Sequence, residues 1–242
     1  DDELERATLA LRVVQDEVSY LLNGLNGGNY MPQSPAETWS NKYGDCKAKS
    51  LLLLAMLREM GIESEAVLVR IRAGDMVSAL LPSLSVFDHM IVRATIGGQE
   101  YWLDGTSAGT RLDTVGEVPA FHYALPVREA GADLIPVTQR WPETLSREVT
   151  VTLDYSAGLD MPVVYAATVI ARGVLGTQMR PQTAETDAQD LRDYAQKYLE
   201  NFVGDGVVYE TKVTYDEGAG VAKLTAHGLM DSDWKWERGR GT

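Results

Sequence analysis

The sequence predicts an α+β protein in which two regions of different texture follow one another. Three observations lead to this class: apolar residues at helical spacing near the N-terminus, β-branched runs after them, and strict alternation from Arg147 onward. With 242 residues, of which 45% are hydrophobic and 24% charged, the chain is long enough to bury a core in each region. We expect N-terminal helices packed on an antiparallel sheet at 1–142, and a smaller β-rich domain with one helix at 143–242.

Three helices are expected in the first quarter of the chain. Residues 3–22 carry apolar side chains at spacings of three and four, which indicates an amphipathic helix. The segment Ser34–Glu37 has the form of a capping box with Pro at the first helical position, so it predicts a short helix through Tyr43. Asp45 then provides an N-cap for a helix over 46–60.

Strands are expected after these helices. Residues 65–71 are rich in β-branched side chains, and Gly97-Gly98 joins two further strands at 87–95 and 99–103 as a tight hairpin. We interpret 73–85 as a loop that borders or covers a cleft. The chain after residue 106 is irregular up to about residue 142, and the second region is expected to hold strands at 147–154, 163–172, 207–215 and 221–227, with one helix at 187–202.

Charge and apolar runs exclude several classes of function. Lys and Arg number 22 against 35 Asp and Glu, a formal charge of −13, whereas a nucleic-acid groove needs a basic patch. The longest apolar run, Leu51–Leu57, is far shorter than the roughly 20 residues of a membrane span. The chain begins at Asp1 and ends without a capping signal. We therefore expect an excised or processed segment whose flanking domains are missing and whose β-rich domain is cut short.

The most informative stretch surrounds the single cysteine, Cys46. A thiol in the first turn of a helix meets unpaired N–H groups and the positive end of the helix dipole, which favour the thiolate. Lys47 and Lys49 add positive charge, whereas Asp45 opposes the effect unless its carboxylate is occupied in capping. The alternative is that Cys46 is a small buried hydrophobe. Phosphate-loop, dinucleotide, metalloprotease and paired-cysteine motifs are missing from the sequence, so we expect no cofactor and no metal.

A histidine and an aspartate are expected on one face of the predicted hairpin. If Gly97-Gly98 is a two-residue turn, paired residue numbers sum to 195, so Ile91 lies opposite Asp104. Side chains alternate along strands, and His89 and Asp104 then project from the same face as diagonal neighbours. An imidazole oriented by a carboxylate is the base of a nucleophilic triad. The alternatives are a hydrogen-bonded sheet histidine and a carboxylate that caps the strand end.

These motifs together resemble the bacterial transglutaminase-like superfamily. The resemblance rests on Gly44–Lys47 followed by Leu51–Leu54, then on Phe87–Arg93, and then on Tyr101–Thr106, in the order Cys, His, Asp. It covers about residues 1–140 and is greatest for envelope proteins in which such a core follows a β-rich domain. The family often has Asp at the position of Ala48 and Pro at that of Gly105, and neither position belongs to the triad.

The resemblance implies a papain-like core with Cys46 as nucleophile, His89 as general base and Asp104 as the residue that orients His89. It implies attack on amide bonds of a protein or peptide through a thioester, resolved by water in a protease or amidase and by an amine in a transglutaminase. The candidate substrate-binding residues are Trp39, Tyr43 and Trp102. Trp39, Asn41 and Tyr43 are also candidates for a second donor to the oxyanion and are equally explicable as packing, whereas Trp102 shares the His89 face and is better explained as a buried aromatic. The resemblance also implies the periplasm or cell envelope. The alternative is a catalytically silent module that binds peptides or acts as a scaffold.

Overall fold

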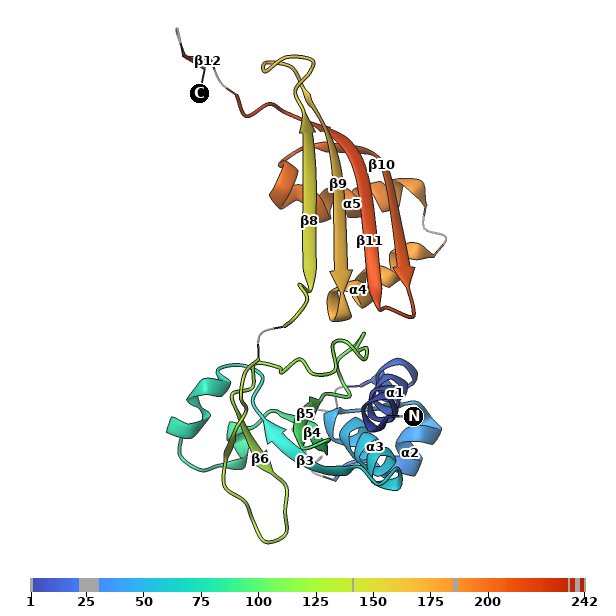
Figure 1. Ribbon diagram of the computed structural model, residues 1–242, viewed down its shortest axis with the longest axis vertical. Coiled ribbons are helices and arrows are strands. Elements are labelled where there is room, and N and C mark those ends of the chain that lie inside the picture. Colours follow the sequence, from blue (N-terminus) through green and yellow to red (C-terminus); the bar gives the residue numbers. More distant parts are fainter. Residues whose placement is uncertain are drawn as a thin grey trace. The chain divides into compact units, whose positions relative to one another are not determined.

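The computed structural model describes residues 2–21, 31–140, 142–184, 187–234, 236–237 and 240–241. The chain divides into two compact units, Asp1–Glu143 and Thr144–Thr242 (Figure 1). Each unit combines helices with an antiparallel sheet, so the α+β class is confirmed. No helix among the described residues is long and apolar enough to cross a membrane.

The first unit is built on a five-stranded antiparallel sheet in the order β5-β4-β3-β6-β7. Helix α3 packs across β3 and β4, and α1 and α2 pack against α3. The main core lies between these helices and the sheet, and it includes Leu11, Leu53, Leu57 and Val92. The strands are β3 (Glu63–Val69), β4 (His89–Ile96), β5 (Gln99–Leu103), β6 (Tyr123–Pro126) and β7 (Ile135–Pro136), and the helices are α1 (Glu3–Glu17), α2 (Pro35–Asn41) and α3 (Cys46–Glu59).

The first two helices are shorter than the sequence predicts. Helix α1 ends at Glu17 and α2 at Asn41, because the residues that follow them form a parallel two-stranded ladder, β1 (Ser19–Tyr20) with β2 (Tyr43–Gly44). The expectations of helix up to residues 22 and 43 were therefore wrong. The ladder brings the end of α1 beside the chain that enters α3, and this arrangement positions the site described below.

The hairpin of β4 and β5 has the register that the Gly97-Gly98 turn predicts. Ile96 pairs with Gln99 and Val92 with Leu103, so paired numbers sum to 195. Both glycines have positive φ, which a two-residue hairpin turn requires and glycine adopts without strain. The segment expected as a loop at 73–85 instead carries two 3-10 helices, η1 (Gly74–Ala79) and η2 (Leu84–Val86).

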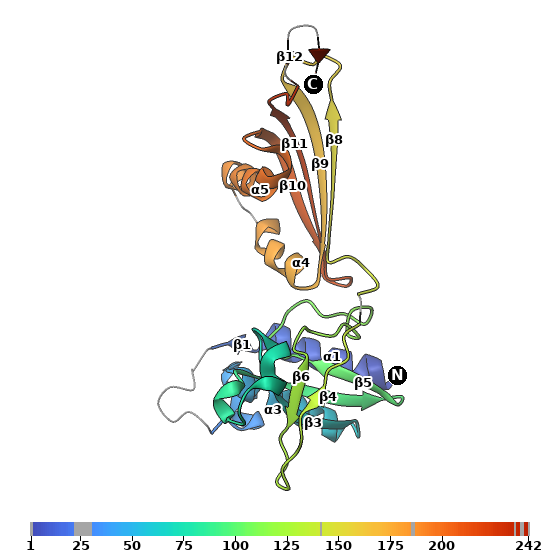
Figure 2. The ribbon, with the colours of Figure 1, turned by 90° about the vertical axis from the view of Figure 1, so that its left-hand side faces the viewer.

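The second unit is a four-stranded antiparallel sheet in the order β10-β11-β9-β8, with helices on one face (Figure 2). The prediction of one helix was incomplete, because α4 and the 3-10 helix η3 also interrupt the strands. Its core gathers Tyr165, Leu199 and Leu224 from sheet and helix. The elements are β8 (Arg147–Asp154), β9 (Val163–Arg172), α4 (Gly173–Met179), η3 (Arg180–Thr183), α5 (Ala188–Val203), β10 (Val207–Asp216), β11 (Val221–Met230), β12 (Trp236–Glu237) and β13 (Arg240–Gly241).

Candidate active site

The single cysteine is the first residue of α3 and is half-buried. Asp45 caps this helix, because its Oδ1 accepts the Ala48 backbone N–H at 3.0 Å. Its other carboxylate oxygen pairs with the Lys47 ammonium. Both carboxylate oxygens of Asp45 therefore have partners, one in the helix cap and one in the ion pair. This is the condition under which Asp45 was expected not to oppose a thiolate at Cys46. The first N–H groups of a helix have no intrahelical acceptor, so the start of α3 is a donor-rich place for a sulfur anion.

The predicted imidazole and carboxylate meet in the first unit. His89 opens β4, Asp104 follows β5 directly, and His89 Nε2 lies 2.9 Å from Asp104 Oδ2. The Thr106 backbone N–H and hydroxyl both donate to Asp104 Oδ1 at 2.8 Å, which fixes the second carboxylate oxygen. The Cys46 side chain lies close enough to His89 to contribute to the raised pKa of the imidazole. Because Nε2 faces Asp104, Nδ1 is the ring nitrogen left for a second partner.

The charges of the three side chains stabilise one another. Burial disfavours protonation of His89, but its hydrogen bonds to Asp104 and Cys46 and their charges outweigh that effect and raise its pKa to about 9. Burial by itself would raise the pKa of Asp104, yet the His89 hydrogen bond and charge, with the two donors from Thr106, hold that pKa below its usual range. With a pKa of about 9 the ring is an imidazolium at neutral pH, paired with the Asp104 carboxylate.

Two buried polar residues of α3 tie the helix to its surroundings. Lys49 is 2% exposed, and its ammonium donates to the Val18 carbonyl at 2.5 Å. Burial lowers the pKa of Lys49 although the charges of Asp104 and Asp16 oppose this. Ser50 is fully buried and its hydroxyl donates to the Met90 carbonyl at 2.8 Å. Helix α3 therefore holds both the chain that leaves α1 and the strand that carries His89.

The structure adds a residue that the sequence did not single out, Tyr20 on β1. It pairs with Gly44, two residues before Cys46, and the Leu21 N–H donates to the Gly44 carbonyl at 3.0 Å. Burial raises the pKa of Tyr20, and the charges of Cys46, Asp45 and Asp104 raise it further. Tyr20 therefore borders the triad. A two-residue strand leaves no periodic signal, so nothing local in the sequence marked it.

The three residues expected to contact substrate lie in different places. Trp102 is 5% exposed and packs with Ile91 and Phe121 in a small core, which agrees with the alternative of a buried aromatic. Trp39 is 44% exposed, and the Lys42 ammonium lies over its ring at 3.1 Å from the centroid. Tyr43 is 40% exposed and lies on β2, three residues before Cys46. For Trp39 and Tyr43 substrate contact stays a prediction.

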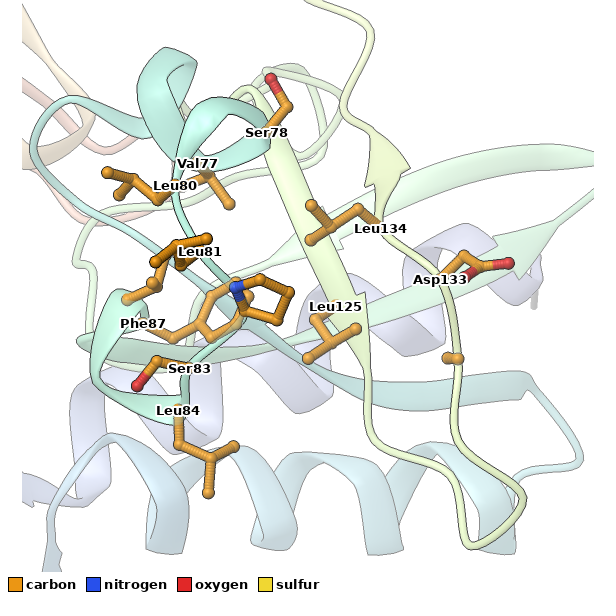
Figure 3. A pocket seen from close by; sticks show the side chains of 13 residues that line it. Val77, Ser78, Leu80, Leu81, Ser83, Leu84, Phe87, Leu125, Asp133 and Leu134 are labelled. Carbon is orange, nitrogen blue, oxygen red and sulfur yellow. The ribbon is translucent and has the colours of Figure 1, made fainter.

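A cavity of about 490 Å³ lies between the segment of η1 and η2 and the chain of β6 and β7 (Figure 3). Leucine side chains and Phe87 line it, so its wall is largely apolar. Phe87 lies two residues before His89, but none of the triad residues is among the described residues that line the cavity. Residues 73–85 thus enclose an apolar hollow beside the start of β4. No group of three His, Cys, Asp or Glu side chains suited to a metal ion occurs among the described residues.

Comparison with known proteins finds a family model that matches the N-terminal part of the chain. Residues 1–103 match the core of the transglutaminase-like superfamily. This match includes Cys46 and His89 and ends one residue before Asp104. None of the curated proteins compared with the sequence is significantly similar to it.

Three solved structures show more distant similarity. A provisionally assigned cysteine protease from Cytophaga hutchinsonii is 20% identical over 41% of this chain and 30% of its own, with a TM-score of 0.31. A provisionally assigned protease from Parabacteroides distasonis is 14% identical over 96% of this chain and 46% of its own, with a TM-score of 0.45. Arylamine N-acetyltransferase from Salmonella typhimurium is 12% identical over 96% of this chain and 70% of its own, with a TM-score of 0.27. The chain thus spans less than half the length of the first two.

Proposed function

Residues 1–103 match the core of the transglutaminase-like superfamily, and from this match together with the site geometry we propose that the first unit is a cysteine acyl-transfer enzyme acting on amide bonds of proteins or peptides. The observation that carries the proposal is the pairing of His89 with Asp104 at 2.9 Å, with Cys46 at the start of α3 near enough to contribute to the raised pKa of His89. A nucleophile, a base and an orienting acid in this order are the parts that acyl transfer needs.

The reaction we propose runs through a thioester. The Cys46 thiolate attacks the carbonyl carbon, a sulfur–carbon bond forms, and the π electrons of the carbonyl move to its oxygen. When the carbonyl re-forms, the carbon–nitrogen bond breaks and the imidazolium of His89 gives its proton to the leaving amine. Neutral His89 then takes a proton from water or from a second amine, which attacks the thioester and expels the sulfur. Asp104 keeps the ring oriented throughout and remains ionised.

The first test is alkylation of Cys46 by iodoacetamide at neutral pH. If Cys46 rests as a thiolate beside a His89 imidazolium, His89→Ala should slow alkylation by roughly tenfold or more, because a free thiol with a pKa near 8.5 is mostly protonated there. The matched control is His122→Asn, which changes the other histidine of this unit and suits the positive φ at that position. A thiol that is slow in the unaltered protein, or equal effects of both variants, would favour the silent scaffold.

A second measurement separates the two possible acceptors. Incubation with p-nitrophenyl acetate should release p-nitrophenolate in the unaltered protein and not in Cys46→Ala, since the thioester forms on this sulfur. Added cadaverine would compete with water for the thioester. Acetyl-cadaverine as the main product would indicate a transferase, and acetate a hydrolase. The envelope location and the protein or peptide substrate stay predictions.

A further inference from the structure

We propose that Tyr20 is a catalytic residue of this site, its phenolic O–H being the second donor to the oxyanion that forms when Cys46 attacks a carbonyl. This inference rests on the proposed function. The first donor is the Cys46 backbone N–H at the start of α3. A backbone N–H supplies one hydrogen bond, whereas the tetrahedral oxygen carries a full charge that one further donor would stabilise.

The β1–β2 ladder brings Tyr20 to this position. Ser19 N–H donates to the Lys42 carbonyl at 2.8 Å and Leu21 N–H to the Gly44 carbonyl at 3.0 Å, so Tyr20 is held between two backbone hydrogen bonds. The Lys49 ammonium fixes Val18, two residues earlier, from within α3. The strand that carries Tyr20 is thus attached to the same helix that carries the nucleophile.

The direction of the Tyr20 side chain follows from its partner. Residues paired across a ladder project from the same face of the sheet. A Cβ placed on Gly44 would meet the Ala48 Cβ at 2.7 Å, so the shared face points at the first turn of α3. Position 44 on β2 therefore accepts only glycine. Because Gly44 has no side chain, the space above the start of α3 is open to the side chain of Tyr20 on β1. Tyr20 is 45% exposed, so part of its side chain is open to solvent.

The chemistry of the phenol suits a donor and not a proton carrier. Burial and the neighbouring charges of Cys46, Asp45 and Asp104 raise the pKa of Tyr20 above its usual value near 10, so the hydroxyl keeps its proton at neutral pH. It donates a hydrogen bond to the oxyanion as negative charge moves from sulfur to oxygen, and it transfers no proton. His89 supplies the proton that the leaving group takes.

The test compares two reactions of the same sulfur in Tyr20→Phe. Acylation by p-nitrophenyl acetate develops an oxyanion, whereas alkylation by iodoacetamide displaces iodide and develops none. We expect acylation to fall by about 10²-fold, the effect of losing one oxyanion donor, with alkylation unchanged. Unchanged alkylation also shows that the variant keeps its folded site. Tyr123→Phe, which removes a hydroxyl from β6 of the same unit, should change neither rate.

The outcomes separate this inference from the proposed function. Normal acylation in Tyr20→Phe, with an active unaltered protein, would overturn the role of Tyr20 and leave the enzyme standing. A loss in Tyr43→Phe in place of Tyr20→Phe would likewise overturn it and assign the donor to β2. Equal loss of acylation and alkylation in Tyr20→Phe would mean that the ring holds the thiol in place, which also contradicts an oxyanion role. An unaltered protein that alkylates but never acylates would refute the proposed function itself.

Discussion

The two units differ in what they bury. Among the described residues, every buried polar or charged side chain belongs to the first unit, and most of these residues lie at or beside α3: Thr8, Thr38, Asp45, Lys49, Ser50, His89 and Arg111. The core of the second unit is apolar apart from tyrosines, and the Tyr165 hydroxyl buried within it has no hydrogen-bond partner. Burying a polar group costs free energy unless it is hydrogen bonded. In the described part of the first unit, the buried polar side chains of Asp45, Lys49, Ser50 and His89 are hydrogen bonded around the start of α3.

This difference predicts a pH-dependent stability that arises from the buried His89–Asp104 pair of the first unit. The pKa of His89 is raised from 6.5 to about 9, so its contribution is fully present below 6.5 and is lost as pH rises through about 9. The shift from 6.5 to about 9 corresponds to a contribution of about 3 kcal/mol to the free energy of unfolding. The pKa of Asp104 is lowered from 3.8, so its contribution is present above 3.8 and is lost as pH falls through the lowered value.

Urea unfolding measured across pH checks this expectation. The midpoint of the first unit should be highest between about 4 and 6.5 and should fall on the alkaline side. His89→Gln should flatten the alkaline limb. A midpoint that falls equally in both proteins between pH 7 and 9 would assign the dependence to other groups.

A smaller effect is expected at Lys49, which ties α3 to the end of α1. Lys49→Met keeps the aliphatic stem but leaves the Val18 carbonyl without its donor, so the free energy of unfolding should fall by about 1–3 kcal/mol. Urea unfolding measures this, with Lys197→Met on the exposed side of α5 as the control. A more stable Lys49→Met protein would show that the cost of burying the charge exceeds the value of the bond.

The smallest effect is expected in the second unit, at Tyr165. Its hydroxyl is buried without a partner, so Tyr165→Phe should leave the free energy of unfolding unchanged or raise it by up to about 1 kcal/mol. The contrast is Tyr215→Phe, which removes a hydroxyl that lies 3.4 Å from the Thr177 hydroxyl and should be mildly destabilising. If Tyr165→Phe proved the more harmful of the two, the second unit would contain a polar interaction that its core does not reveal.

The parts of the site that the sequence predicted are those set by local rules. A Gly-Gly turn fixes the register of its hairpin, and the two-residue period then brings His89 and Asp104 to one face. Asp45 before a helical pattern marks an N-cap, so the place of Cys46 at the start of α3 also followed from neighbouring residues. Each of these inferences needs fewer than twenty consecutive residues.

The sequence by itself thus determined the α+β class, the start of α3 at Cys46, and the pairing of His89 with Asp104. The tertiary structure alone decided that the helical pattern after Glu17 gives way to β1, that Trp102 is buried, and that Tyr20 lies beside the triad. The physical reason is that a two-residue strand has no periodicity of its own. Its hydrogen bonds come from Lys42, Gly44 and Lys49, which are more than twenty residues away along the chain and meet it only once α3 has packed on the sheet.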